Sequence, residues 1–372
     1  MTDYVAKPNI DIIYGGAWGD EGKGKVVSSL HDYEIYVRYN GGPNAGHTIY
    51  VDGEKKAVHQ LPSGAVFKNK ACYIGPGCVL NLEKLYEEAQ RLDFDLKRLS
   101  IHPNTTIIEP DHILDDIANL HKSQGSTANG IAPAYAAKHG RVARTFGQLK
   151  QSDEDLPYYV KIILERVTCE GFNYGKLKET KILIEAAQGI NLDINLGNYP
   201  YVTSSSCSPF AACSTLGFSP RKIRHIICVA KAYDTRSGVD DDFYPYQGAV
   251  LEAHLHENKE VFNKIAELGN EYGTTTGRAR QVSFLNLKKL ISGLAKVFPT
   301  VIVINKLDIL DEVNVYKYWD GFIWDWEARV GFTTSIRKAI NSLYIKNGFD
   351  LPQIIFSSTP HPDNEIKRAL ND

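Results

Sequence analysis

The fold is decided by residues Ile12 to Val27, which read IIYGGAWGDEGKGKVV. An apolar strand signal over residues 12–14 leads directly into a glycine-rich turn, residues 15–24, and the apolar residues after Lys25 can begin a helix. Glycines at this spacing let backbone N–H groups approach a phosphate, and the N-terminus of the following helix adds a favourable dipole. The stretch therefore predicts a P-loop-like phosphate loop after the first strand of an α/β domain.

The charged residues of this loop suit a nucleoside triphosphate. Lys23 and Lys25 supply cations for the β- and γ-phosphates, and residues 19–25 match most of the motif G-x-x-x-x-G-K. Val26 stands where that motif places its magnesium-binding Ser or Thr, so the metal ligand must come from elsewhere, and Asp20 is the obvious candidate. The alternative is a glycine-rich surface turn with solvated charges, but strand, glycines, lysines and carboxylate occur in the order that phosphate binding needs.

Composition sets the broad class of the protein. The chain has 372 residues, and strand and helix signals alternate along it with no low-complexity linker. This alternation predicts one domain spanning residues 1–372, with a mostly parallel central sheet flanked by helices. A net charge of −2 implies no basic surface for nucleic acid. The N-terminus has no apolar signal core and no run is long enough to span a bilayer, so we expect a cytoplasmic protein without a membrane partner.

Several polar loops follow predicted strands. The loop NGGPNAGHT, residues 40–48, follows a strand signal and contains three glycines and a proline before His47. A lone histidine is usually structural, but one that follows a phosphate loop and a strand is a candidate catalytic residue. The strand signal at residues 181–187 delivers Gln188 to its carboxyl end, where open α/β sheets bind ligands.

The acidic turn at residues 240–242 offers three consecutive carboxylates. They could bind a metal ion, but contiguous side chains point in different directions. We therefore expect a solvated loop there.

Two later stretches indicate a carboxylate and a guanine. The stretch GTTTGRAR, residues 273–280, places Arg278 and Arg280 two positions apart, so they share a face if extended and form a fork for a carboxylate; the alternative is a flexible exposed loop. The strand signal TVIVI runs into Asn305-Lys-Leu-Asp308. N-K-x-D is a guanine-reading motif because the carboxylate accepts hydrogen bonds that adenine cannot donate. Residues 357–360 follow the last predicted strand and can close a base pocket.

Taken together, six stretches in order resemble the adenylosuccinate synthetase family. They are GDEGKGK, NAGHT, GSTANGIAPAY, AAQG followed by YPYVTSS, TTTGRAR and NKLD. The form GGPNAGHT resembles the archaeal and bacteriophage branch, which includes phage 2-aminoadenylosuccinate synthases that accept dGMP. The resemblance implies a ligase of purine nucleotide biosynthesis. It would join L-aspartate to C6 of a 6-oxopurine nucleoside monophosphate through a 6-phosphoryl intermediate, driven by GTP or ATP. A viral member would work in the host cytoplasm.

The resemblance also implies roles for individual residues. It makes Asp20 the general base and, with the Gly46 carbonyl, a ligand of Mg²⁺. The implied catalytic residues are Asp20, His47, Lys23 and Gln188. The implied triphosphate contacts are Gly19, Glu21, Gly22, Lys23, Gly24, Lys25, Lys306, Asp308, Ser357 and Pro360. The implied acceptor-nucleotide contacts are Asn44, Thr127, Arg141, Gln188, Thr203, Ser237 and Gly238. The implied aspartate contacts are Thr275, Thr276, Arg278 and Arg280. Arg141 matches an arginine that the family donates across a dimer interface, so a homodimer is expected.

The departures from the family pattern leave the acceptor open. Ala132 stands where a glycine is usual, and Arg236-Ser-Gly238 replaces the usual R-V-G near the acceptor ribose. Retained Asp20 favours IMP, because a 2-amino group beside N1 would crowd a general base. The altered ribose loop favours dGMP. Asp308 favours GTP as the donor, and ATP remains an alternative.

The main rival is a GTP-binding regulatory module. It would explain the phosphate loop and N-K-L-D, but not His47, the arginine pair or Gln188. A switch would hydrolyse GTP without aspartate and a purine nucleotide, whereas a ligase would require both. A catalytically inactive relative is a further alternative, against which the intact Asp20, Lys23 and His47 argue.

Overall fold

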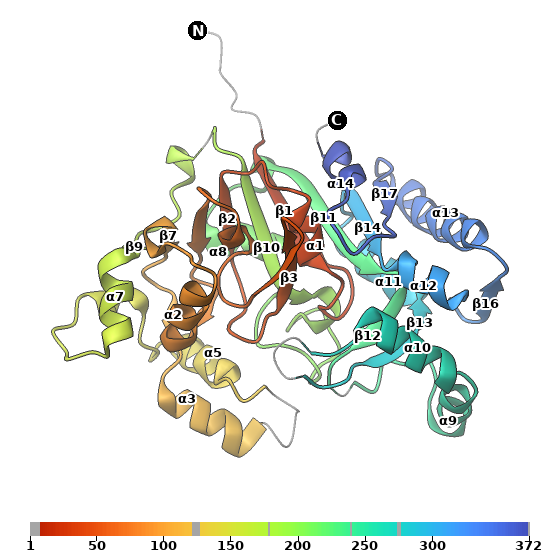
Figure 1. Ribbon diagram of the computed structural model, residues 1–372, viewed down its shortest axis with the longest axis horizontal. Coiled ribbons are helices and arrows are strands. Elements are labelled where there is room, and N and C mark those ends of the chain that lie inside the picture. The colour runs from red at the N-terminus through yellow and green to blue at the C-terminus, as the bar shows by residue number, and fades with distance from the viewer. Residues whose placement is uncertain (1–7, 121–126, 178, 239, 274–276, 371–372) are drawn as a thin grey trace, which may run out of the picture.

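A nine-stranded sheet forms the centre of the molecule (Figure 1). The computed structural model describes residues 8–120, 127–177, 179–238, 240–273 and 277–370. Across the sheet the strands are, in order, β17 (Gln353–Phe356), β14 (Val301–Asn305), β11 (Ile223–Lys231), β1 (Ile10–Gly15), β10 (Ile182–Gly189), β2 (Ile35–Arg38), β5 (Ala71–Ile74), β7 (Leu99–Ile101) and β9 (Thr168–Cys169). Every neighbouring pair is parallel, which confirms the predicted α/β class.

Both faces of the sheet are covered, and successive residues of β1 alternate between them. Ile12 belongs to a core with α8 (Pro209–Leu216), α11 (Leu287–Ala295) and α13 (Arg329–Asn347). Ile13 belongs to a second core with α1 (Lys23–Ser28) and α14 (Asn364–Ala369). A strand buried on both faces reads as a continuous apolar run, and that is why the strand signals lack the polar alternation of a half-exposed sheet.

Smaller elements complete the fold. A four-stranded sheet contains β12 (Tyr233–Arg236), β13 (Gln281–Asn286), β15 (Tyr316–Trp319) and β16 (Ile323–Trp326). Two strand pairs are β3 (His47–Val51) with β4 (Glu54–Val58), and β6 (Val79–Leu80) with β8 (Thr106–Ile107).

The remaining helices gather at the two ends of the central sheet. One group is α2 (Leu82–Arg91), α3 (Pro110–Asp115), α5 (Ile131–His139), α6 (Phe146–Lys150) and α7 (Tyr158–Arg166). The other is α9 (Gly248–Glu257), α10 (Lys259–Gly269) and α12 (Leu307–Val313). Figure 1 shows α2, α3, α5 and α7 at one end and α9, α10 and α12 at the other. Within the described ranges, no helix combines the length and apolarity needed to cross a membrane.

The carboxyl ends of the central strands meet along one edge. Gly15 at the end of β1 pairs with Gly189 of β10, and Lys231 of β11 pairs with Asn305 of β14. The phosphate loop, Gln188 and the N-K-L-D stretch therefore leave the sheet at the same edge, where ligands bind in open α/β folds. One local expectation changes: the helix after the loop begins at Lys23, three residues before the first apolar residue of the pattern, Val26.

Asp234 in β12 predicts a dependence of stability on pH. Its buried carboxylate accepts the Asn286 N–H at 2.7 Å, and burial raises its pKa to about 7. Because the folded-state pKa exceeds the unfolded value, the stabilisation is present at low pH and is lost as pH rises through the folded pKa. Between pH 6 and 8 this group should lower the free energy of unfolding by about 1 kcal/mol.

Urea unfolding of the wild type and Asp234→Asn at both pH values measures this change. Asp234→Asn should lack the part of the decrease in unfolding free energy that Asp234 causes between pH 6 and 8. Asp241→Asn, which changes an exposed carboxylate, should show the same decrease as the wild type. Identical pH dependence in the wild type and Asp234→Asn would contradict the assignment.

Candidate active site

The phosphate loop depends on glycine at specific positions. Gly22 precedes α1 with φ of 88°, in the left-handed region that glycine adopts without strain. Gly24 lies against the β3 strand so closely that a Cβ there would come within 2.3 Å of the Thr48 carbonyl oxygen. A side chain at Gly24 would therefore push the loop away from β3.

The charged pair inside the loop faces inward. Glu21 and Lys23 are both buried, and the Glu21 carboxylate accepts the N–H groups of Ala17 at 3.0 Å and Gly19 at 2.7 Å. Lys23 Nζ donates to the Gly19 carbonyl at 2.9 Å, the Gln188 carbonyl at 2.7 Å and Glu21 at 3.0 Å. These three bonds use all three donors of the ammonium group. Glu21 and Lys23 thus shape the loop, and Lys23 must exchange one of these partners to contact a phosphate.

His47 begins β3 and is oriented by a buried carboxylate. Its Nδ1 lies 3.1 Å from Glu185 Oε2 and 3.1 Å from Ser63 Oγ. With Nδ1–H donating to Glu185, Nε2 is the nitrogen left for a ligand. Burial lowers the pKa of His47, as do the charges of Arg38 and Lys23, while Glu185 acts in the opposite direction. Burial raises the pKa of Glu185, but the bond from His47 outweighs it and the pKa lies below its usual range.

We expect Glu185→Gln to lower turnover by about 100-fold, the lower end of what general acid–base catalysis contributes. Glutamine keeps the shape but removes the charge that favours the imidazolium, so the pKa of His47 should fall further. The His47 ring titration by NMR measures this directly and separates it from a loss of fold. Glu88→Gln, which alters a buried carboxylate on α2, is the control. An unchanged His47 pKa in Glu185→Gln would contradict the role.

A cavity of about 190 Å³ contains most of the predicted acceptor residues. Its predicted lining residues are Gly19, Asp20, Asn44, Gly46, His47, Thr127, Gln188 and Ser237. Gln188 Nε2 donates to Asn44 Oδ1 at 3.2 Å, and its Oε1 is buried with no hydrogen-bond partner among the described residues. This amide oxygen is an available acceptor at the cavity for an N–H of a base.

The other predicted acceptor residues lie around that cavity. Thr203 N–H donates to the carbonyl of Leu192, a lining residue, at 2.8 Å. The Gly238 carbonyl accepts from Gln281 at 2.5 Å. Arg141 is exposed just beyond α5, with φ of 63°, and lines neither this cavity nor the one described next.

A second cavity, of about 550 Å³, contains most of the predicted triphosphate residues. Its predicted lining residues are Gly19, Asp20, Glu21, Gly22, Lys23, Gly24, Lys25, Gly46, His47, Arg280, Lys306, Asp308 and Pro360. Asp308 Oδ1 is buried without a hydrogen-bond partner in the described part of the chain. Lys306 Nζ donates to the Gly269 carbonyl at 2.9 Å.

Lys25 joins the phosphate loop to the stretches predicted to read guanine. Its Nζ donates to Asn305 Oδ1 at 3.1 Å and to Ser357 Oγ at 2.6 Å. Burial lowers the pKa of Lys25 to about 8, with Lys306 acting in the same direction. Ser357, which is buried, therefore positions Lys25.

The two cavities share a wall. Gly19, Asp20, Gly46 and His47 line both of them. A group bound in the smaller cavity and a group bound in the larger one would therefore meet beside Asp20 and His47. Both protein oxygens proposed for Mg²⁺, the Asp20 carboxylate and the Gly46 carbonyl, stand at this junction. Oxygen ligands of this kind fit Mg²⁺, which commonly binds one or two carboxylates together with substrate phosphates and water.

Arg280 lies in a charged cluster beside this junction. Its Nη1 contacts Glu271 at 2.6 Å and its Nε contacts Asp20 at 2.9 Å. Glu271 also accepts two bonds from Lys231 at 2.9 Å and one from Tyr233 at 2.7 Å. Burial raises the pKa of Glu271, but the cations outweigh it and lower the pKa to about 2. The ionised Glu271 therefore holds Arg280 in place.

The structure says less about the other residues predicted to bind the substrate aspartate. Arg278 is exposed, and Thr275 and Thr276 lie outside the described residues. Glu185, Lys231 and Glu271 were missed by the sequence analysis. The carboxylate of Glu185 within the apolar run KILIEAA was a usable signal, since a buried strand seldom carries an unpaired charge.

The expectation of a solvated acidic turn is wrong for Asp240. Its carboxylate is buried and accepts from Trp18 Nε1 at 3.2 Å and Asn198 Nδ2 at 2.8 Å, and Arg236 lies 3.3 Å away. Asp241 is exposed, as expected. The segment expected near the acceptor ribose is thus tied to Trp18, the residue directly before the phosphate loop's Gly19.

Comparison with known proteins relates the chain to one group of enzymes. Residues 12–168 and 163–326 match the family model of adenylosuccinate synthetase. The chain is 34% identical over 369 residues to the adenylosuccinate synthetase of Aquifex aeolicus, covering 88% of this chain and 83% of that protein. It is 35% identical over 363 residues to the chloroplastic adenylosuccinate synthetase of Ostreococcus tauri, covering 84% of this chain and 72% of that protein.

Two solved structures have the same fold. The fully ligated adenylosuccinate synthetase from Plasmodium falciparum superposes with a TM-score of 0.79 at 24% identity, covering 96% of this chain and 99% of that one. The succinoaminodeoxyadenylate synthetase of cyanophage S-2L, bound to dGMP and to dATP as an energy donor, superposes with a TM-score of 0.71 at 20% identity, covering 98% of both chains.

Proposed function

Because this chain belongs to the adenylosuccinate synthetase family, we propose that it joins L-aspartate to C6 of IMP or dGMP, with GTP or ATP as the donor. It is an enzyme, a ligase of purine nucleotide biosynthesis, and a regulatory GTP-binding module is not favoured. The observation that carries the proposal is the wall of Asp20 and His47 shared by the two cavities. We treat residues 1–372 as one domain. The cytoplasmic location of the protein stays a prediction.

The proposed chemistry follows from this junction. The C6 oxygen of a purine is a poor leaving group, so it is first phosphorylated. Asp20 takes the proton from N1, and O6 then attacks the γ-phosphoryl group, whose bond to the β,γ-bridging oxygen breaks to release the nucleoside diphosphate. His47 faces the transferring group through Nε2. As the imidazolium, which the Nδ1–H bond to Glu185 favours, it stabilises developing charge there and acts as general acid. The aspartate amine then attacks C6, the C6–O6 bond breaks to release phosphate, and the amine nitrogen loses a proton.

Adenylosuccinate synthetases use Mg²⁺, and the proposed ligands here are the Asp20 carboxylate and the Gly46 carbonyl. When bound, the ion supplies charge neutralisation for the transferring phosphoryl group. The chain's own contribution is positional. The loop amides of Gly22 and Gly24 hold the triphosphate, and Lys23 supplies a cation once it exchanges a loop partner.

The open polar atoms support the nucleotide assignments. The unpartnered Asp308 Oδ1 supports guanine in the larger cavity, because guanine N1–H and N2–H can donate to it. The unpartnered Gln188 Oε1 supports a purine in the smaller cavity, with Asn44, Thr127, Thr203, Ser237 and Gly238 around the sugar and phosphate. Arg280, with Thr275, Thr276 and Arg278, is proposed to bind the aspartate carboxylates.

The acceptor is settled by a substrate matrix. IMP, GMP, dGMP and AMP are combined with GTP, ATP or dATP, each with and without aspartate, and phosphate release and product mass are measured. The expected result is phosphate release only when aspartate and IMP or dGMP are both present, with product mass increased by the aspartyl group. Hydrolysis independent of both would overturn the proposal and favour a switch.

We also propose a homodimer in which Arg141 reaches the acceptor phosphate of the partner. Its exposure, and its absence from both cavities of its own chain, support this. An equal mixture of inactive Asp20→Asn and Arg141→Ala protomers should regain about a quarter of wild-type activity, because half the dimers are mixed and each mixed dimer has one intact site. Activity assays after mixing measure this, with each variant alone as the control. No recovery despite confirmed subunit exchange would contradict the shared site.

A further inference from the structure

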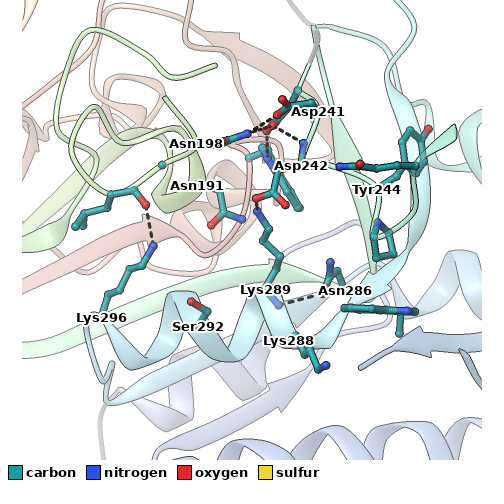
Figure 2. A pocket seen from close by; sticks show the side chains of 17 residues that line it. Asn191, Asn198, Asp241, Asp242, Tyr244, Asn286, Lys288, Lys289, Ser292 and Lys296 are labelled. Atoms are coloured by element: carbon teal, nitrogen blue, oxygen red, sulfur yellow. Dashed lines mark hydrogen bonds and ion pairs between the residues drawn. The ribbon is translucent and has the colours of Figure 1, made fainter. Parts of the chain in front are cut away.

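A third cavity, of about 640 Å³, has Trp18 among its lining residues and is distinct from the two already described. Figure 2 shows the side chains that line it. One wall is α11, where Lys289, Ser292 and Lys296 stand at positions i, i+3 and i+7 and so share a helix face. The opposite wall is formed by residues 196–198 and 240–242. Of the residues predicted for substrate, donor or metal that the structure describes, none lines this cavity.

The charges on α11 are only partly compensated. Lys289 Nζ pairs with Asp242, whereas Lys296 Nζ donates to the Leu196 carbonyl at 2.8 Å and Lys288 Nζ lies 5.0 Å from the centre of the Trp319 ring. Lys288 and Lys296 have no carboxylate within ion-pair distance in the described part of the chain. Partial burial and the charge of Lys289 lower the pKa of Lys296. An anion bound near Lys289 and Lys296 would therefore relieve the repulsion between their amines.

A buried amide supplies independent evidence for a ligand. Asn191 is 8% exposed, and its Nδ2 has no hydrogen-bond partner within the described residues. In Figure 2 its side chain points from the wall into the cavity, toward the side from which Lys289 and Lys296 rise. A buried donor without a partner is unfavourable, and an anionic oxygen in the cavity would satisfy it. Two cations and an amide donor thus face the same space.

The far end of the cavity is aromatic. Lys288 and Lys296 are eight residues apart, so their positions are separated by about 12 Å along α11. Tyr244 and Trp319 line the cavity at the Lys288 end, as Lys288 lies over the Trp319 ring. An elongated ligand would therefore meet Lys289, Lys296 and the Asn191 amide at one end, and ring faces beside Lys288 at the other.

We propose that this cavity binds a second nucleotide, separate from the acceptor and donor, as a regulatory ligand. Its phosphate lies among Lys289, Lys296 and Asn191, and its base lies against Trp319 and Tyr244. The volume is in the range of small-molecule sites. The features that the cavity would recognise are a phosphate group and a flat ring system joined in one molecule.

Trp18 connects this cavity to the active site. Lys289 Nζ lies 5.9 Å from the centre of the Trp18 ring, and Trp18 Nε1 donates to Asp240. A phosphate that draws Lys289 away from Asp242 changes the contacts of Trp18, which lines the acceptor cavity and directly precedes Gly19. Binding of the regulatory nucleotide in the third cavity thus changes the affinity of the active site for the acceptor. By linkage, acceptor binding changes the affinity for the regulatory nucleotide by the same factor.

The test uses radiolabelled AMP as the probe in equilibrium dialysis. The full-length enzyme is first saturated with unlabelled acceptor nucleotide and a non-hydrolysable GTP analogue, without aspartate. The expected result is one further AMP bound per chain. Lys289→Ala/Lys296→Ala should weaken this binding at least about 10-fold, because two charged contacts are lost. Ser292→Glu, an exposed substitution that places a negative charge on the same face, should weaken it as well.

The matched control is Lys338→Ala/Lys346→Ala, which removes two exposed lysines from α13 and should leave AMP binding unchanged. Thermal melts verify that every variant is folded. Failure of AMP to bind the saturated enzyme at millimolar concentration would overturn the proposal, as would wild-type affinity in the Lys289/Lys296 double variant. Aspartate ligation is assayed separately, so lysine-dependent AMP binding by a chain that failed to ligate aspartate would refute the proposed function alone.

Discussion

Asp20→Asn should reduce turnover by at least about 1,000-fold while nucleotide binding remains measurable. Asparagine keeps the shape of the side chain but cannot take the N1 proton, and it removes the charge that faces Arg280 and the proposed metal. The loop itself is held by Glu21 and Lys23, so it should keep its conformation. Steady-state rates of adenylosuccinate-type product formation, with donor binding by calorimetry, measure the two effects separately.

The control for Asp20→Asn is Asp241→Asn, which changes an exposed carboxylate in the turn at residues 240–242. This variant enzyme should turn over substrate at the wild-type rate. A rate for Asp20→Asn within tenfold of the wild type would remove Asp20 from the role of base. If Asp20→Asn lost donor binding as well as turnover, Asp20 would instead be assigned to shaping the loop.

The second large effect is expected from Arg280→Lys. A guanidinium can contact Glu271 and Asp20 at once and still present an edge to a substrate carboxylate, whereas one ammonium group cannot reproduce that planar geometry. The KM for aspartate should rise by about 100-fold, the size expected when a buried, hydrogen-bonded charge pair is broken. The KM for the acceptor nucleotide should change much less. Initial-rate kinetics with each substrate varied in turn separate these effects.

Arg337→Lys on α13, far along the chain from this cluster, is the control and should leave both constants unchanged. A wild-type KM for aspartate in Arg280→Lys would show that the carboxylate binds elsewhere. Glu271→Gln should move the aspartate KM in the same direction as Arg280→Lys, because it removes the charge that holds Arg280.

The fold could be predicted because its signals are local. The run at residues 12–14 is apolar without alternation, and the structure buries Ile12 and Ile13 on opposite faces of a parallel sheet. The glycine spacing of the loop was equally visible, since it follows from the backbone. Both signals depend on neighbouring residues and need no knowledge of distant partners.

The site was predicted less completely, because its charges are paired over long distances in the sequence. Lys23 contacts the carbonyl of Gln188, and Asp240 is buried against Trp18, 222 residues away. No local pattern distinguishes Lys23 from a lysine that points to solvent, or Asp240 from Asp241. Glu271 was missed for the same reason, since its partners Lys231 and Arg280 come from separate stretches. The roles of Thr275 and Thr276 stay predictions.

The position of β1 at the middle of the sheet has a consequence during synthesis. Its two neighbours are β10 and β11, which end at Gly189 and Lys231. A nascent chain therefore carries an apolar strand with both edges unpaired until β10 has left the ribosome, and with one edge unpaired until β11 has followed. Unpaired strands of this kind associate with one another, and late pairing between distant segments is slow. Cells that produce this protein should need a chaperone that shields residues 10–15 during translation.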